Sequence, residues 1–145
     1  MDIREIQNRA PLMAVFIRNG LEPPDPATCT SVSKSWALVE DEQIVGGVCV
    51  GVAGEHFILD YLAVDAPARG RGWGFRLLDT ALRHARRENA HEIYTVTKVP
   101  AFFRKSGFRS IRRDDAPDFS QCFTCRQYQV DCFPDVMSLT FTSID

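Results

Sequence analysis

Three glycines alternate with large side chains near the middle of the chain, directly before a helix-like pattern, in the stretch Arg69-Gly70-Arg71-Gly72-Trp73-Gly74. The N-terminus of a helix presents backbone N–H groups without intrahelical partners and the positive end of the helix dipole. Anions bind there when no side chain blocks their approach, and arginines add charge-assisted hydrogen bonds. The stretch therefore predicts a site for phosphate groups.

Two common phosphate-binding loops do not fit this stretch. A Walker loop ends in Gly-Lys-Ser/Thr, whereas Gly74 is followed by Phe75 and Arg76. A dinucleotide-binding loop has the spacing G-x-G-x-x-G, whereas the spacing here is G-x-G-x-G. The 145 residues are also few for the usual doubly wound sheet. The predicted site thus belongs to another class of phosphate-binding protein.

The elements around the loop follow from the apolar pattern. Residues 56–65 are apolar and β-rich, and they end where the loop begins. The helix after the loop directs its apolar positions inward and its arginines outward; the inward positions are Leu77, Leu78, Ala81, Leu82 and Ala85. We expect His84 and His91, around the end of this helix, to face solvent.

Further elements are predicted on both sides of this unit. A first helix begins at a cap, Asn8, and ends at Gly20, with a buried stripe of Leu12, Met13, Phe16 and Ile17. The other predicted strands cover residues 35–40, 44–52, 92–97, 126–130 and 136–141, and a short helix spans residues 98–106 with Thr97 as its cap. This order predicts a single mixed α/β (α+β) domain over residues 1–145, built on one sheet.

Composition and charge restrict the function classes. Hydrophobic residues make up 45% of the chain and charged residues 25%, which is typical of soluble globular proteins. Residues 1–66 carry 4 basic and 10 acidic side chains, whereas residues 67–145 carry 13 basic and 9 acidic ones. Six arginines lie between Arg69 and Arg87. Such a short basic site suits a small polyanion rather than a nucleic-acid backbone, so we expect no nucleic-acid partner.

The sequence also indicates a compartment. No apolar run approaches the length of a membrane span, and the N-terminus lacks the pattern of a signal peptide. We therefore expect a cytoplasmic protein without a membrane partner, whose five cysteines are reduced thiols. Cys122, Cys125 and Cys132 have a spacing that would suit three zinc ligands, but no histidine lies nearby to complete the site, and we expect no metal.

Two segments closely resemble the GCN5-related N-acetyltransferase family. The first is Arg69-x-x-Gly72-x-Gly74, preceded by Leu62-Ala63-Val64-Asp65 and followed by Leu77-Leu78. The second, residues 101–108, reads A-F-F-R-K-S-G-F and is similar to the family's A-x-F-Y-x-K-x-G-F. The resemblance is specific over residues 55–110, and its wording is also similar to the acetyltransferase domain of N-acetylglutamate synthases.

This resemblance implies a fold and a cosubstrate. The sheet, mostly antiparallel, would splay open between the strands at 56–65 and 92–96, and the pantetheine arm of acetyl-CoA would pair with backbone groups of Leu62 and Val64. Backbone N–H groups from Gly70 to Phe75 would hold the pyrophosphate. The cofactor-binding residues implied are Leu62, Ala63, Val64, Arg69, Gly70, Arg71, Gly72, Trp73, Gly74, Phe75, Thr97 and Phe103. For Thr97, a simple helix cap is an equally good interpretation.

The implied reaction is direct attack of an amine on the thioester of bound acetyl-CoA. An alkyl amine is mostly protonated at neutral pH, so a base or a water relay helps. We favour Asp60 as that base, with His56 second, because His56, Ile58 and Asp60 share one side of a strand. An ordinary polar residue at the sheet rim is the alternative for either. Phe103 stands where many relatives have a tyrosine that protonates the leaving sulfur, and phenylalanine cannot.

The acceptor is predicted only as a class, the amine of a small molecule, with an α-amino acid suggested by the resemblance. Many members of the family form dimers, so a homodimer is compatible with the sequence but not required by it. Two other functions stay open at this point. One is a non-catalytic acyl-CoA-binding or regulatory module, and the other is a metal- or redox-responsive protein that uses the cysteines of the tail.

Overall fold

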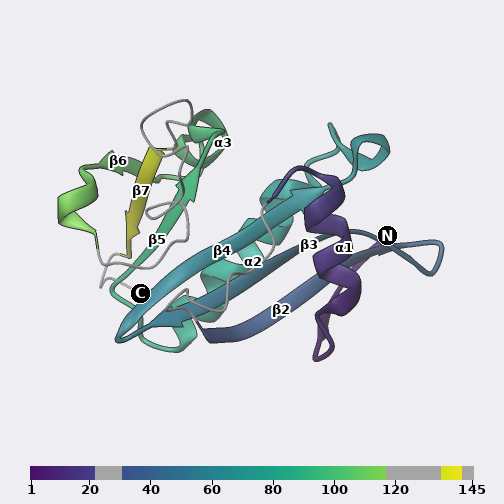
Figure 1. The fold of residues 1–145 in the computed structure, drawn as a ribbon, viewed down its shortest axis with the longest axis horizontal. Coiled ribbons are helices and arrows are strands. Elements are labelled where there is room, and N and C mark those ends of the chain that lie inside the picture. Colours follow the sequence, from purple (N-terminus) through teal and green to yellow (C-terminus); the bar gives the residue numbers. More distant parts are fainter. Residues whose placement is uncertain (22–30, 117–134, 142–145) are drawn as a thin grey trace.

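A single mixed sheet organises the chain, with the strand order β1-β2-β3-β4-β5-β7-β6 (Figure 1). The computed structural model describes residues 1–21, 31–116 and 135–141. Within these ranges the strands are β1 (Asp2–Ile6), β2 (Ser31–Glu40), β3 (Gln43–Ala53), β4 (His56–Val64), β5 (Glu92–Thr97), β6 (Arg109–Ile111) and β7 (Asp135–Thr140). The helices are α1 (Ala10–Arg18), α2 (Trp73–Arg87) and α3 (Pro100–Arg104), and short 3₁₀ turns cover Ala66–Ala68 and Arg113–Asp115. The predicted single mixed sheet is confirmed.

Strands β1 to β4 form an antiparallel series. Asp41 and Glu42 connect β2 to β3 with φ angles of 52° and 64°, which suits a two-residue hairpin turn. The sequence prediction missed β1, whose residues Asp2, Arg4 and Glu5 are polar and exposed. This strand forms because it pairs with the edge of β2, with Arg4 opposite Ala37. The intrinsic β-propensity of its polar residues contributes little.

The sheet divides between β4 and β5. These two strands run parallel and pair only at Phe57 with Ile93 and at Ile58 with Tyr94. The hydroxyl of Thr95 then donates a hydrogen bond to the carbonyl of Leu59, at 3.1 Å, and the strands diverge beyond it (Figure 1). Strand β5 continues instead against β7 over its whole length. The splayed sheet implied by the family resemblance is therefore present.

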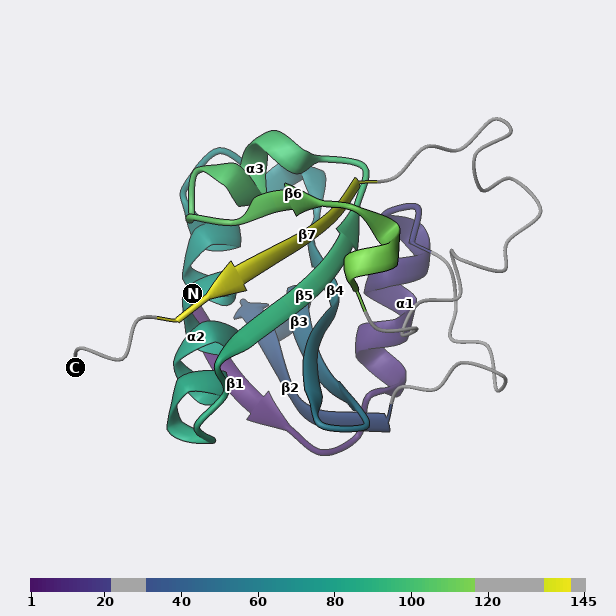
Figure 2. The same cartoon turned by 90° about the vertical axis from the view of Figure 1, so that its left-hand side faces the viewer.

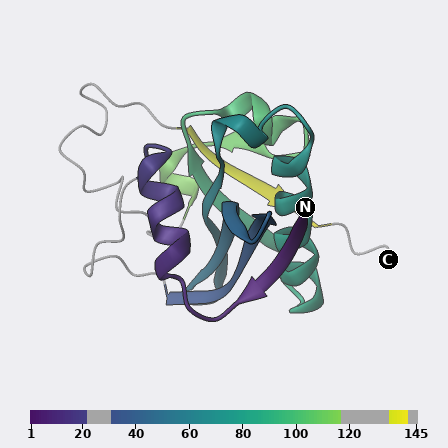
Figure 3. The same cartoon turned by 90° about the vertical axis from the view of Figure 1, so that its right-hand side faces the viewer.

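Helices α1 and α2 cover opposite faces of the sheet (Figures 2 and 3). Leu12 and Phe16 of α1 pack on Cys49, and a Cβ atom at Gly47 would overlap with the side chain of Leu12. Glycine at this position thus admits α1 to the sheet. On the other face, α2 contributes its apolar side to the main core, which consists of Trp36, Leu38, Val48, Val50, Leu59, Leu77, Leu78, Ala81, Ala85, Ile93, Phe103, Phe108 and Met137.

Several local predictions are corrected by the structure. In α1, Val15 is buried whereas Ile17 is 52% exposed, so the buried stripe is Leu12, Val15 and Phe16. His84 does not face solvent; it is buried, with its ring edge-on to Trp36 at a centroid distance of 5.5 Å. The helix predicted over residues 98–106 is shorter, Pro100–Arg104. The predicted strand at 126–130 lies outside the described residues.

The described helices were also compared with the requirements of a membrane span. None of those within residues 1–21, 31–116 and 135–141 is long and apolar enough to cross a bilayer.

Candidate functional site

The glycine-rich stretch connects the end of β4 to the start of α2. Gly70 and Gly72 have φ angles of 80° and 82°, and Gly72 is the residue before the first helical residue, Trp73. A Cβ atom at Gly70 or Gly72 would meet no atom within 4 Å, so the space beside the backbone is open. A left-handed backbone in two places within three residues explains the glycines, because other residues are strained there.

The first turn of α2 offers donors to a ligand. No described residue accepts a hydrogen bond from the backbone N–H of Trp73, Gly74 or Phe75, and the first turn contains no acidic residue. The helix has 15 residues, so its dipole adds positive potential at this end. Gly74 also approaches Phe102, whose ring would lie 3.2 Å from an added Cβ atom. The predicted geometry of a phosphate-binding loop is thus present, although phosphate binding itself stays a prediction.

The arginines of the loop are already engaged within the protein. Arg69 donates through Nε to the carbonyl oxygen of Val64 at 2.8 Å and through Nη2 to Oδ1 of Asn19 at 2.7 Å. Arg71 donates to the carbonyl oxygen of Pro67 at 3.1 Å and pairs with Glu40 at 3.4 Å. The sequence suggested that both arginine side chains would contact phosphates. In the structure, each side chain also makes hydrogen bonds to other parts of the protein that hold the loop in place.

Among the described strands, none pairs with β4 beyond Leu59 on the edge that faces away from β3, and this part of β4 is called the open edge. The N–H of Asp65 donates to Val45 on the β3 side, whereas the carbonyl of Val64 faces the other side and accepts from Arg69. Because successive residues of a strand direct their peptide groups to opposite edges, Leu62 faces the open edge with Val64, and Ala63 faces β3. Of the three predicted contacts here, Leu62 and Val64 are on the open edge. Ala63 is opposite Gly47 and packs toward α1.

Asp60 lies at a β-bulge in β4. Val50 of β3 is opposite Leu59 and Cys49 is opposite Tyr61, so Asp60 has no counterpart in β3. Burial raises the pKa of its carboxyl to about 7, and the positive charge of Arg9 opposes this rise. The Asp60 charge also acts on Cys49, which belongs to the cluster under α1. Asp60 is therefore a partly buried carboxyl on the α1 face that can exchange a proton near neutral pH.

His56, the second candidate base, is not brought to the same place. It is exposed at the first position of β4, and its ring stands edge-on to Tyr94 at 5.7 Å. Four residues of extended chain separate it from Asp60, which corresponds to about 13 Å. Asp60 is near the divergence of β4 and β5, whereas His56 lies on the paired side of it. A catalytic role for either residue stays a prediction.

Thr97 and Phe103 both have structural partners. The hydroxyl of Thr97 accepts a hydrogen bond from the N–H of Val99 at 2.9 Å, but the predicted cap is wrong: the residue before α3 is Val99, and Thr97 instead stabilises the turn that leads into the helix. Phe103 is only 5% exposed and packs edge-on to Phe102 and Phe108 in the main core. The surface beside Gly74 is formed instead by Phe102 and by Phe75, which is 40% exposed and stacked on it.

Phe103 has no hydroxyl, and Tyr61 of β4 and Tyr94 of β5 are two tyrosines whose hydroxyl could take that role. Tyr61 stacks on Phe16, under α1. Tyr94 is buried beside Ile58, and burial together with Glu92 raises the pKa of its hydroxyl to about 12. Such a phenol is a weak proton donor at neutral pH, so Tyr94 is poorly suited to protonate a leaving thiolate.

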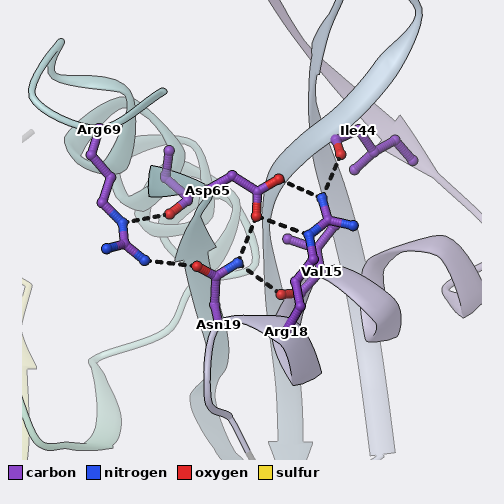
Figure 4. Close-up of polar contacts among 7 residues, drawn as sticks. Val15, Arg18, Asn19, Ile44, Asp65 and Arg69 are labelled. Carbon is purple, nitrogen blue, oxygen red and sulfur yellow. Dashed lines mark hydrogen bonds and ion pairs between the residues drawn. The ribbon is translucent and has the colours of Figure 1, made fainter. Parts of the chain in front are cut away.

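Sequence reasoning missed a polar network at the end of α1 (Figure 4). Arg18 and Asn19 contact Asp65, which follows β4, and Asn19 also contacts Arg69. The only signal in the sequence was the predicted helix end at Gly20. Arg9, whose charge acts on Asp60, was missed as well, because this interaction results from the packing of α1 along β4.

The chain was compared with known proteins. The family model described as "Acetyltransferase (GNAT) family" matches residues 3–108, which is most of the chain and includes both motifs and the open edge. The chain belongs to the GNAT family of acetyltransferases. No curated protein sequence matches it significantly.

Solved structures share the fold of this GNAT protein at low sequence identity. GCN5 from Tetrahymena is 19% identical with a TM-score of 0.68, and the match covers 98% of this chain and 97% of that one. An acetyltransferase of the GNAT family from Staphylococcus aureus is 18% identical with a TM-score of 0.70, over 97% and 100% of the two chains. N-acetylglutamate synthase from Neisseria gonorrhoeae, in complex with coenzyme A and N-acetyl-glutamate, is 16% identical with a TM-score of 0.70; the match covers 98% of this chain and 36% of the synthase.

Proposed function

We propose that this protein is an acetyl-CoA-dependent N-acetyltransferase that acetylates the amine of a small molecule in a ternary complex. One observation carries the proposal: the open edge of β4 leads directly into a glycine loop whose N–H donors at the start of α2 have no partner among residues 1–21, 31–116 and 135–141. Coenzyme A is a linear diamide arm followed by a pyrophosphate, so its two parts match these two features in the same order. Membership of the GNAT family supports the same assignment.

The residues present fit coenzyme A on their own chemistry. The peptide groups of Leu62 and the N–H of Val64 are available for the arm, as in the addition of a strand to a sheet edge. Trp73, Gly74 and Phe75 provide N–H groups for the pyrophosphate, and Gly70 and Gly72 leave its approach open. When bound, acetyl-CoA supplies the activated acyl group as a thioester.

Within this proposal, Asp60 is the general base. An ammonium group with a pKa of about 10 must lose a proton before its nitrogen can attack the acetyl carbon. A carboxyl whose pKa is about 7 accepts that proton more readily than an ordinary carboxylate. The new C–N bond forms as the C–S bond breaks and the thiolate leaves; the nitrogen then gives its second proton to the thiolate or to water, which yields the neutral amide and the thiol of coenzyme A. Because a thiol has a pKa of about 8.5, departure without an acid at position 103 is feasible.

The acceptor we propose is an amine that also carries a carboxylate, such as an α-amino acid. Arg9 is half-buried at the start of α1, its charge acts on Asp60, and no described residue accepts a hydrogen bond from its side chain. A guanidinium beside the base can bind a carboxylate through two parallel hydrogen bonds. The synthase with the same fold was solved with N-acetyl-glutamate, which is an acetylated amino acid. A cytoplasmic location and a homodimer stay predictions.

Calorimetric titration with acetyl-CoA, with NAD as a control ligand, tests the proposed cosubstrate. We expect saturable binding that is lost in Gly72→Val, since a side chain there blocks the loop. Gly54→Val is a matched control, because Gly54 also has a positive φ, 63°, and open space around it, but lies in the β3–β4 hairpin. Absence of binding to wild-type protein, or equal loss in both variants, would contradict the proposal.

Release of free thiol from acetyl-CoA on addition of amino acids then separates an enzyme from a non-catalytic acyl-CoA-binding module. Phe103 is buried and has no hydroxyl that could protonate the leaving thiolate, and this observation favours the non-catalytic module as the second candidate function. Binding without thiol release from any tested amine would favour the module.

A further inference from the structure

A continuous chain of hydrogen bonds connects β3, α1 and the glycine loop at the open edge of β4 (Figure 4). Arg18 donates through Nε to Oδ1 of Asp65 at 3.0 Å, pairs through Nη2 with Oδ2, and reaches the carbonyl of Ile44 at 3.0 Å. Asp65 accepts a third bond, at Oδ1, from Nδ2 of Asn19 at 2.8 Å. The side-chain oxygen Oδ1 of Asn19 accepts a hydrogen bond from Nη2 of Arg69 at 2.7 Å, and Nε of Arg69 donates to the backbone carbonyl of Val64 at 2.8 Å.

Asn19 has the chemistry that this place requires. Its amide donates to the Asp65 carboxylate and accepts from the Arg69 guanidinium at the same time, and its Nδ2 also donates to the carbonyl of Val15 at 2.9 Å. An aspartate could accept from Arg69 but would repel Asp65, and an aliphatic side chain could do neither. The amide therefore orients the guanidinium of Arg69 along the end of β4.

The network contains two guanidinium groups and one carboxylate, so one positive charge is in excess. The Arg18 guanidinium contacts Asp65 in a two-pronged pair, and these bonds together with Asn19 and Arg69 lower the pKa of the Asp65 carboxyl. The side chain of Asp65 is only 19% exposed. Two N–H groups of Arg69 are directed at the protein, which leaves fewer of its donors for a ligand than the sequence suggested.

We propose that Arg69 and Asn19 are positioning residues for the cofactor arm. By occupying the carbonyl of Val64, Arg69 leaves Leu62 and the N–H of Val64 as the groups that pair with the arm, and so fixes where the arm lies along β4. Because Asn19 holds Arg69, it connects α1 to the end of β4 and to the glycine loop through hydrogen bonds. This inference rests on the proposed function, because it concerns how acyl-CoA is held.

A double-mutant cycle on the full chain tests this arrangement. The variants are Asn19→Leu, Arg69→Lys and the double variant, titrated with acetyl-CoA and with 3′-phosphoadenosine 5′-diphosphate, which has the pyrophosphate but no pantetheine arm. Lysine keeps the charge of Arg69 but cannot make both directed bonds. We expect each single variant to bind acetyl-CoA about tenfold more weakly, the double variant to be no worse, and binding of the nucleotide probe to change less than twofold.

Other outcomes would overturn the proposal. If Asn19→Leu leaves both affinities unchanged while Arg69→Lys weakens both probes equally, Arg69 is a ligand of the phosphates. If Tm falls but the ratio of the two affinities stays constant, the network is only structural. Additive losses in the double variant would mean that the two side chains act independently. Arg83→Ala, on the exposed face of α2, controls for the loss of a positive charge.

The wild-type titration separates this inference from the function beneath it. If wild-type protein does not bind acetyl-CoA, both fail together. If wild-type protein binds acetyl-CoA but the variants give one of the contradicting outcomes of the preceding paragraph, the proposed function stands and the positioning role is wrong.

Discussion

The two halves of β4 have the same neighbour on one side and different neighbours on the other. Phe57 and Ile58, in the first half, lie between β3 and β5. Leu62 and Val64, in the second half, pair with β3 alone among the described strands. Between the halves are the bulge at Asp60 and the hydroxyl of Thr95, which takes the place of the next ladder bond. The first half therefore contributes to stability, and the second has peptide groups to offer a ligand.

The open edge of β4 is partly covered by a side chain. An unpaired strand edge in water invites pairing with another chain. Here Arg69 covers the carbonyl of Val64, so the open edge is short and partly occupied. The same strand thus changes from a structural element to a candidate binding element within a few residues, without a change in its apolar character.

The largest effect on stability is expected in the paired half. Ile58 is 1% exposed and packs with Tyr94, Ala53 and Val136. Ile58→Ala should lower the free energy of unfolding by about 3 kcal/mol, because it removes buried methylene groups and leaves a cavity. Leu62→Ala, in the open half and only partly buried, should cost less than half as much. Urea denaturation measures both, and equal losses would remove the distinction between the two halves.

The next effect is expected at the bulge. If Asp60 is the base, Asp60→Asn should lower kcat/KM by about 10²-fold, and the rise of the wild-type rate with pH near 7 should disappear. Rates with a fixed amine between pH 5.5 and 9 measure this. A variant that retains the wild-type rate and pH profile would show that the base is elsewhere.

The same substitution has a consequence for stability. Asp60 has a pKa of about 7 in the folded protein against an ordinary value of 3.8, so folding disfavours its ionised form. Its contribution to stability is present below the unfolded pKa and is lost as the pH rises from about 4 to about 7. Asp60→Asn should therefore be more stable than wild type at pH 8, with the difference shrinking toward pH 4; urea denaturation at the two pH values measures it.

The smallest effect is expected on the other side of the divergence, at Thr97. Thr97→Val keeps the shape of the side chain but removes the bond from the N–H of Val99. If Thr97 only stabilises the turn before α3, the free energy of unfolding should fall by about 1 kcal/mol and the affinity for acetyl-CoA should stay within about twofold. Thermal denaturation and calorimetry give the two quantities. A loss of affinity with unchanged stability would instead assign Thr97 to the cofactor site.

Much of the fold could be predicted because its signals are local. The strand predicted over residues 92–97 has the observed bounds, and the glycine loop with its helix is where the alternating residues indicated. Positive φ angles at Gly70, Gly72 and Gly107 favour glycine, because a Cβ atom would be strained there. This preference can be recognised from the single residue at each position. Strand β1 escaped prediction because its pairing with β2, and not its own composition, makes it a strand.

The candidate site was predicted in part for the same reason. Glycines before a helix identify donors for an anion from sequence alone. The sequence could not indicate that Ala63 faces β3 or that Phe103 lies in the core, because the pairing of β4 with β3 and the packing of α3 decide these points. The distance between His56 and Asp60, by contrast, follows from the predicted strand itself, since four extended residues separate them.

By itself, the sequence determined the order of the elements from α1 to α3, the open backbone at the start of α2, and the family to which the motifs belong. These properties depend on residues that are neighbours in the chain. Only the tertiary structure decided the raised pKa of Asp60, the open edge of β4, and the network that brings Asn19 to Asp65 and Arg69 across 46 and 50 positions of sequence. Desolvation and hydrogen bonds between distant residues arise only when packing brings them together, and no local pattern of residue types encodes that proximity.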